Sequence, residues 1–155
     1  MSTHTLRFEV NGQSQEVTVE AHHLLIDLLR ERLGLTGTKE ACSIGVCGAC
    51  SVLVDGKVVS ACLMPAVMVD GAKVQTVEGL AAPDGQLSPL QDAFIRYGGF
   101  QCGICTPGQL MAATALLAEQ PHPTIDQIKE WMMGNLCRCT GYYKIIDSIV
   151  AASQA

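Results

Sequence analysis

The chain has 155 residues, of which 48% are hydrophobic and 16% charged, so it is expected to be a packed globular protein rather than a disordered one. A net charge of −5, an aromatic content of 5% and the lack of a basic stripe argue against a nucleic-acid-binding protein. No apolar run approaches the roughly 18 residues that a membrane helix requires, so no membrane insertion is expected.

The first half of the chain has the pattern of a small sheet with one helix. Two hairpins are predicted, because Asn-Gly and Asp-Gly dipeptides tolerate the positive φ of a tight turn between strands. Leucines at helical spacing from Leu24 to Leu33 predict a helix that ends at Gly34. The predicted strand pairs are Leu6–Val10 with Glu16–Glu20, and Ser51–Val54 with Lys57–Ser60.

The second half has the pattern of four helices, which fits a small bundle. Three of them follow a capping signal, and the last carries one apolar stripe at helical spacing. The signals are Ser88-Pro89 before Leu90–Tyr97, Thr106 with Gln109 before a run to Ala118, Thr124 with Gln127 before a helix through Met133, and the stripe from Tyr142 to Val150.

The segment between Val77 and Pro89 is rich in turn-forming residues and has no hydrophobic period. We therefore expect a compact α+β domain at residues 1–77, a linker at residues 78–88 and a helical domain at residues 89–155.

The strongest chemical signal is the loop Cys42-x4-Cys47-x2-Cys50, with Cys62 following after eleven residues. This is the plant-type spacing for a [2Fe–2S] cluster, in which a loop supplies three thiolates and a later segment the fourth. Small residues within the loop allow backbone N–H groups to point at the sulfur atoms. Structural zinc or buried free thiols are the alternatives, but zinc sites favour two short CxxC-like pairs.

A second set of four cysteines comprises Cys102-x2-Cys105 and, thirty-one residues later, Cys137-x-Cys139. This spacing predicts a four-thiolate site without naming the metal, since zinc and an iron–sulfur cluster are both acceptable. Cys105 and Cys139 each precede a predicted helix start. The positive ends of two helices would then stabilise anionic thiolates.

The N-terminus lacks the apolar core of a secretory signal, so we expect a cytoplasmic protein. In a reducing compartment the eight cysteines are better explained by metal binding than by disulfides.

Two long segments resemble the signature sequences of the iron–sulfur domain of the xanthine oxidase (molybdenum hydroxylase) family. They are Gln101-Cys-Gly-Ile-Cys-Thr-Pro-Gly108 and Gly134-Asn-Leu-Cys-Arg-Cys-Thr-Gly-Tyr142, and Ala41–Val52 is similar to the plant-type loop of that family. The resemblance extends over nearly the whole chain. It implies an α+β fold, with a β-grasp plant-type ferredoxin domain followed by a four-helix-bundle domain, each holding one [2Fe–2S] cluster.

The resemblance further implies that Cys102, Cys105, Cys137 and Cys139 bind the cluster nearer the molybdenum. It implies that Gln101 and the backbone around Cys139 contact a molybdopterin on a large partner subunit. The Cys42, Cys47, Cys50 and Cys62 cluster would relay electrons outward, to FAD on a medium subunit or to a cytochrome. The substrate, an aldehyde or N-heterocycle, would be hydroxylated on the large subunit, so no catalytic residue is expected here.

Ser43 stands where many family members have glycine, and Ser51 where threonine is common. We expect altered hydrogen bonding near the first cluster at most. Arg138, between two of the cysteines, could balance cluster charge, bind a partner or form a plain salt bridge.

A stand-alone two-cluster ferredoxin is the alternative function, and a zinc-binding scaffold is a third. A free ferredoxin would need a charged docking surface, whereas this chain has a mean hydropathy of +0.27. That excess of apolar residues favours an obligate complex.

Overall fold

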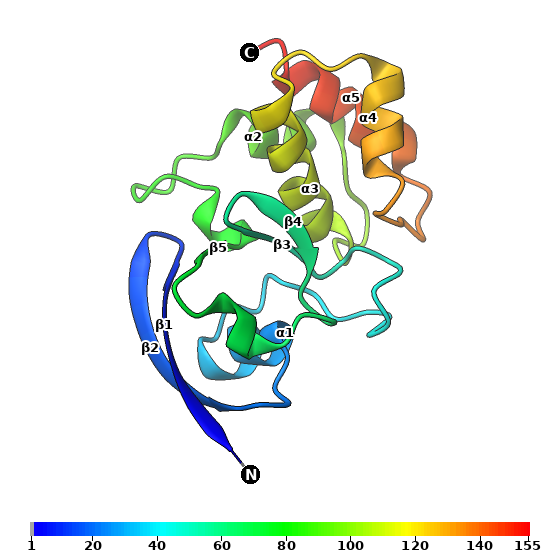
Figure 1. The fold of residues 1–155 in the computed structure, drawn as a ribbon. Coiled ribbons are helices and arrows are strands. Elements are labelled where there is room, and N and C mark those ends of the chain that lie inside the picture. The colour runs from blue at the N-terminus through cyan, green and yellow to red at the C-terminus, as the bar shows by residue number, and fades with distance from the viewer. Residues whose placement is uncertain (1) are drawn as a thin grey trace.

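The computed structural model describes residues 2–155 and shows an α+β fold, in which a five-stranded sheet with one short α-helix lies beside four longer helices (Figure 1). No helix in this part of the chain is long and apolar enough to cross a membrane. The strands are β1 (Thr3–Val10), β2 (Gln13–Glu20), β3 (Ser51–Val54), β4 (Lys57–Ser60) and β5 (Lys73–Gln75), and the helices are α1 (Leu25–Asp27), α2 (Pro89–Tyr97), α3 (Thr106–Glu119), α4 (Ile125–Met132) and α5 (Tyr142–Ala152).

Both predicted hairpins are present. Val10 pairs with Gln13 and Val54 with Lys57, so each turn has two residues. Asn11 and Asp55, with the glycines that follow them, have the positive φ angles that such turns require.

The sequence did not predict β5, which joins the two hairpins into one sheet of order β2-β1-β5-β3-β4. It runs parallel to β1 and antiparallel to β3, with Val74 paired to both Val10 and Val54. A three-residue strand with one apolar residue between Lys73 and Gln75 carries almost no periodic signal.

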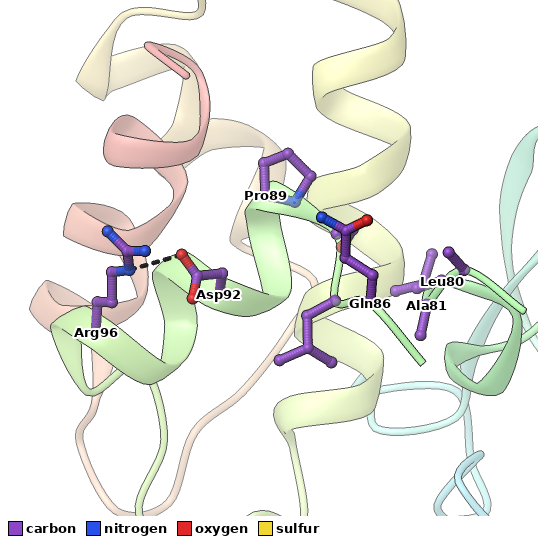
Figure 2. A pocket seen from close by; sticks show the side chains of 9 residues that line it. Leu80, Ala81, Gln86, Pro89, Asp92 and Arg96 are labelled. Atoms are coloured by element: carbon purple, nitrogen blue, oxygen red, sulfur yellow. Dashed lines mark ion pairs between the residues drawn. The ribbon is translucent and has the colours of Figure 1, made fainter. Parts of the chain in front are cut away.

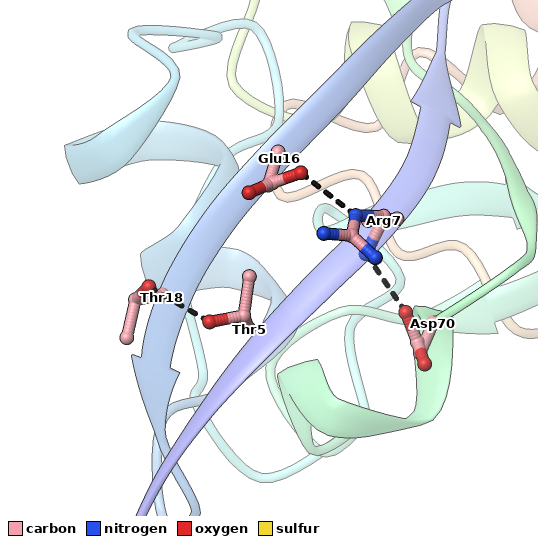
Figure 3. A network of polar contacts seen from close by, with 5 residues as sticks. All are labelled: Thr5, Arg7, Glu16, Thr18 and Asp70. Carbon is pink, nitrogen blue, oxygen red and sulfur yellow. Dashed lines mark hydrogen bonds and ion pairs between the residues drawn. The ribbon is translucent and has the colours of Figure 1, made fainter.

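On the exposed face of the sheet, polar side chains join β1 to its neighbours (Figure 3). Thr5 and Thr18 face each other across β1 and β2, and Arg7 Nε donates to Glu16 at 2.7 Å. The backbone N–H of Arg7 donates to the carboxylate of Asp70 at 2.8 Å. The carboxylate of Asp70 thus accepts a backbone hydrogen bond from β1 at a position that the short strand β5 does not reach.

The predicted leucine helix forms only partly as an α-helix. After α1 it continues as a π-helical turn (Leu28–Arg32), because the N–H of Leu33 bonds to the carbonyl of Leu28 five residues back. Gly34, at φ +69°, follows where the helix was predicted to end.

Four helices follow the linker, and two of the three predicted caps are correct. Ser88 and Thr124 each form a reciprocal capping box with the glutamine three residues on. The box predicted for Thr106 and Gln109 is wrong. Cys105 is the N-cap of α3 without a side-chain bond, and the Gln109 amide instead reaches the backbone of Asn135.

The two halves pack through α3, which lies against β3 and β4 (Figure 1). Each half has its own apolar core, and a third cluster joins them: Leu53 of β3 with Met111 and Ala115 of α3. Burial at this junction fixes the helices on the sheet.

Leu53→Ala is predicted to destabilise the protein by about 2–4 kcal/mol, because it opens a cavity at this junction. The midpoint of urea unfolding of the cluster-loaded chain measures it. Ile125→Ala, at a side chain that is 52% exposed, is the control and should change stability by less than about 0.5 kcal/mol. Equal effects of the two changes would show that Leu53 does not hold the halves together.

Candidate metal centres

The first set of cysteines lies at one end of the β3–β4 hairpin. Cys50 directly precedes β3, and Cys62 follows β4 by two residues. Because Ser51 pairs with Ser60, the hairpin brings these two cysteines together, and the N–H of Ala61 bonds to the carbonyl of Cys50. Both are buried, at 2% and 3% exposure, whereas Cys42 and Cys47 on the preceding loop are partly exposed.

The nearest contacts between the thiols of this set join them two by two, and the Cys50 thiol also lies close enough to Cys47 for their charges to interact. Cys42 interacts with Cys47, whose N–H also points at the Cys42 sulfur at 3.4 Å, and Cys50 interacts with Cys62. Backbone N–H groups, that of Ile44 above all, lower the pKa of Cys42 to about 6. Burial raises the pKa of Cys50 to about 11. One edge of the set therefore favours an anion, while the other is enclosed by protein.

The second set lies where three of the four helices begin or end. Cys102 and Cys105 precede α3, while Cys137 and Cys139 lie between α4 and α5. The thiols again interact in pairs, Cys102 with Cys139 and Cys105 with Cys137. The pKa of Cys102 is lowered by the N–H of Ile104, and burial raises the pKa of Cys105 to about 12.

Helix starts adjoin this second set, as predicted. Cys105 is itself the N-cap of α3, and the N–H of Gly141, the N-cap of α5, donates to the Cys137 sulfur at 3.3 Å. The partial positive charge of both helix ends therefore lies beside the thiols.

Two side chains brace the second set. Gln101 Nε2 donates to the carbonyl of Cys139 at 2.9 Å, which ties the two cysteine segments together. The Tyr142 hydroxyl accepts the N–H of Cys137 at 2.9 Å. Sequence reasoning placed Tyr142 in an apolar stripe and missed this contact, although a phenol three residues after Cys139 was a signal for it.

The two sets meet at a close backbone contact, which we call the seam: residues 47–51, 108–109 and 134–136. The N–H of Leu136 donates to the carbonyl of Cys47 at 2.9 Å. A methyl group on Gly48 would overlap with the carbonyl of Gly134, and one on Gly108 would overlap with the carbonyl of Gly48. Segments that carry thiols of both sets are thus in direct contact.

The residues present fit a binuclear cluster at each set. Each iron of a [2Fe–2S] cluster takes two protein thiolates, so four thiols grouped two by two are what it requires. Thr38 and Thr106, near Cys42 and Cys105 in sequence, have buried hydroxyls without a partner in residues 2–155, which leaves donors free for an acceptor. Within the same residues, no group of three or more His, Cys, Asp or Glu side chains has the arrangement needed to hold a single metal ion.

The structure shows the local contacts of three residues that the sequence analysis singled out. Ser43 has φ +55°, which explains a preference for glycine there, and its hydroxyl lies 2.7 Å from Glu40 Oε1. Ser51 is buried and its hydroxyl contacts the Asn135 amide. Arg138 is exposed and forms no ion pair within residues 2–155.

A groove of about 850 Å³ is lined by no cysteine of either set (Figure 2). Linker residues such as Leu80 and Gln86 line it beside α2, where Arg96 and Asp92 form an ion pair at 2.6 Å. A smaller apolar groove of about 370 Å³ lies beside the second set, between Phe94, Phe100 and Pro107.

Two family models match the chain. Residues 8–81 match a 2Fe-2S iron-sulfur cluster binding domain, and residues 76–150 match a [2Fe-2S] binding domain. The small subunit of nicotine 6-hydroxylase from Paenarthrobacter nicotinovorans is 50% identical over 93% of this chain and 86% of its own length. The small FeS subunit of nicotinate dehydrogenase from Eubacterium barkeri is 47% identical over 94% of this chain and 92% of its own length.

The structure of quinoline 2-oxidoreductase from Pseudomonas putida 86 superposes on it with a TM-score of 0.94 at 46% identity, covering 99% of this chain and 95% of that one. The chain therefore belongs to the small [2Fe–2S] subunits of the molybdenum hydroxylase (xanthine oxidase) family. The predicted fold, a ferredoxin-like domain followed by a helical [2Fe–2S]-binding domain, is confirmed.

Gly48→Ala is predicted to prevent loading of the first set, because the methyl group would push the cysteine loop off the seam. Iron content and visible circular dichroism after reconstitution measure it. Gly56→Ala is a matched control: Gly56 also has positive φ, at +79°, but nothing within 4 Å of its Cβ position. Both changes should cost about 1–2 kcal/mol in backbone strain, and only Gly48→Ala should lose iron. Full iron loading of that variant would contradict the account of the seam.

Proposed function

We propose that this chain is the electron-transfer subunit of a heteromeric molybdenum hydroxylase and binds one [2Fe–2S] cluster at each set of cysteines. When bound, such a cluster takes up or releases one electron at a time. Oxidative hydroxylation removes two electrons from the substrate, so a two-site chain suits the transfer of single electrons to an acceptor. The proposed ligands are Cys42, Cys47, Cys50 and Cys62 for the first cluster and Cys102, Cys105, Cys137 and Cys139 for the second.

The observation that carries this proposal is the grouping of thiols in pairs, together with the seam between the two sets. The hydrogen bond from Leu136 to Cys47 joins the residue before Cys137 to a proposed ligand of the other cluster. Backbone N–H groups at Cys42 and Cys137 lower the cost of holding anionic sulfur, and the buried thiols exclude water from the inner edges.

A large molybdopterin-binding subunit is the proposed partner, and exposed apolar residues support an obligate complex. Ten of the fifteen large apolar side chains that are exposed in residues 2–155 lie within four residues of a cysteine of either set. Such gathering marks an interaction surface rather than random exposure. A free ferredoxin with a charged docking surface is disfavoured for the same reason. The ten are Ile44, Val46, Val58, Leu63, Phe100, Ile104, Met133, Leu136, Tyr142 and Tyr143.

The acceptor we propose is FAD on a medium subunit or a cytochrome, reached from the first set. The substrate class we propose is an aldehyde or N-heterocycle; relatives named for nicotine and quinoline support the latter.

We place the protein in the cytoplasm, since thiols grouped for metal binding are typical of a reducing compartment. We also propose the domain boundaries 1–77 and 89–155, supported by a linker at 78–88 without strand or α-helix.

Gln101 and the backbone of Cys139 are the proposed contacts to molybdopterin. The Gln101 side chain is exposed at the second set, and its Nε2 is already bound to the Cys139 carbonyl. This bond fixes the side chain in place, so that its amide oxygen can face a partner without further ordering.

Reconstituted protein is predicted to give two S = 1/2 signals in low-temperature electron paramagnetic resonance after dithionite reduction, with iron and acid-labile sulfide in equal amounts. The reason is that each set has thiols for one binuclear cluster. Cys47→Ser should remove one signal and about half of the iron. One signal with bound zinc at the second set would refute the proposed function.

Gln101→Ala is predicted to leave the iron content unchanged, because one hydrogen bond worth about 1 kcal/mol is lost while all thiols remain. Reduction of the second cluster by the substrate-loaded partner, followed by stopped-flow absorbance, should slow by about fivefold or more. Loss of iron would instead give Gln101 a purely structural role. Gln86→Ala in the linker is a control that should alter neither quantity.

A further inference from the structure

The seam contains a buried polar network that neither metal binding nor the fold alone explains. Asn135 Nδ2 donates to the carbonyl of Gly48 at 3.0 Å and contacts the Ser51 hydroxyl at 3.4 Å. The backbone carbonyl of Asn135 accepts from Gln109 Nε2 at 2.9 Å. Asn135 is 6% exposed and Gln109 1%, so water competes little for these bonds.

The hydrogen bonds of Asn135 and Gln109 involve backbone groups that lie next to cysteines of both sets. Gly48 follows Cys47 in the chain, and Asn135 lies two residues before Cys137. The N–H of Gln109 bonds to the carbonyl of Cys105 at 2.9 Å in the first turn of α3. Two amide side chains therefore connect the segments that hold Cys47, Cys105 and Cys137.

Burial of two primary amides is costly unless their hydrogen bonds are made, and apolar side chains would fill the same space without that cost. Apolar contacts have little directional preference, so the cysteine loop could shift along the helices if they alone held it. The hydrogen bonds of Asn135 and Gln109 specify one position of the loop against the helices. In that register the Leu136 N–H meets the carbonyl of Cys47.

We propose that Asn135 and Gln109 are positioning residues that hold the two cysteine sets in one register and thereby set the rate of electron exchange between them. This rests on the proposed function, because it takes both sets to bind redox clusters. Electron transfer through protein falls exponentially with separation, so a small slip at the seam slows exchange without removing any ligand.

Gln109→Met and Asn135→Leu remove the amides while keeping side-chain size. The full reconstituted chain is reduced by one electron in a pulse, and the equilibration between the two clusters is followed by absorbance. Exchange should slow severalfold, because electron transfer falls exponentially as the separation of the two clusters grows. The magnetic interaction that broadens the two resonance signals of fully reduced protein should weaken in parallel.

Gln127→Met is the matched control, since it also removes an amide from the first turn of a helix, α4, but lies outside the seam. It should leave exchange and signal broadening as in the wild type. Exchange within twofold of the wild type in Gln109→Met, with both signals present, would overturn the proposal.

If Asn135→Leu loses iron, Gln109→Met alone decides, because the Gln109 side chain donates its hydrogen bond to the backbone of Asn135 and to no cysteine. A loss of stability in Gln109→Met with unchanged exchange would assign the network to folding and also overturn the proposal. Failure of the proposed function would look different, since the wild type itself would then lack two [2Fe–2S] signals.

Discussion

The approach of Gly48 to Gly108 and Gly134 is the constraint on which most of this structure depends. No Cβ fits at Gly48 or at Gly108, so the cysteine loop approaches the carbonyl of Gly134 and the first turn of α3 at backbone distance. The contact places the N-cap of α3 beside the first loop, and it leaves room for the Asn135 amide to reach Gly48. The placement of the two cysteine sets relative to each other follows from this close approach.

Anionic sulfur is stabilised here by the backbone rather than by basic side chains. Amide N–H groups point at Cys42 and Cys137, and the helix starts at Cys105 and Gly141 adjoin the second set. Arg138, which lies between Cys137 and Cys139, is exposed and forms no ion pair within residues 2–155. A protein with a net charge of −5 can thus hold further negative charge without a basic pocket.

Sequence patterns predicted the parts of the fold that are set locally. Two-residue turns at Asn11 and Asp55 and the caps at Ser88 and Thr124 depend on neighbouring residues, and all four are correct. The pattern failed where tertiary contacts decide, as for β5, whose three residues are ordered by the strands on either side.

Gln109 shows the same limit within the candidate site. Its spacing from Thr106 matched a capping box, but a buried acceptor at Asn135 competes for the amide. The two groups of four cysteines could be predicted from spacing and resemblance. Their pairing, Cys50 with Cys62 and Cys105 with Cys137, depends on the hairpin and on helices brought together by folding.

The burial of the seam has a consequence for how the surroundings respond when charge moves. The dipoles of Asn135 and Gln109 are fixed by hydrogen bonds and shielded from water, so they cannot turn to follow an electron. Mobile water molecules would reorient around each new charge, and this reorientation would have to be undone before the next transfer. Fixed dipoles of this kind keep that reorganisation energy small, and a small driving force is then sufficient for transfer in the forward direction.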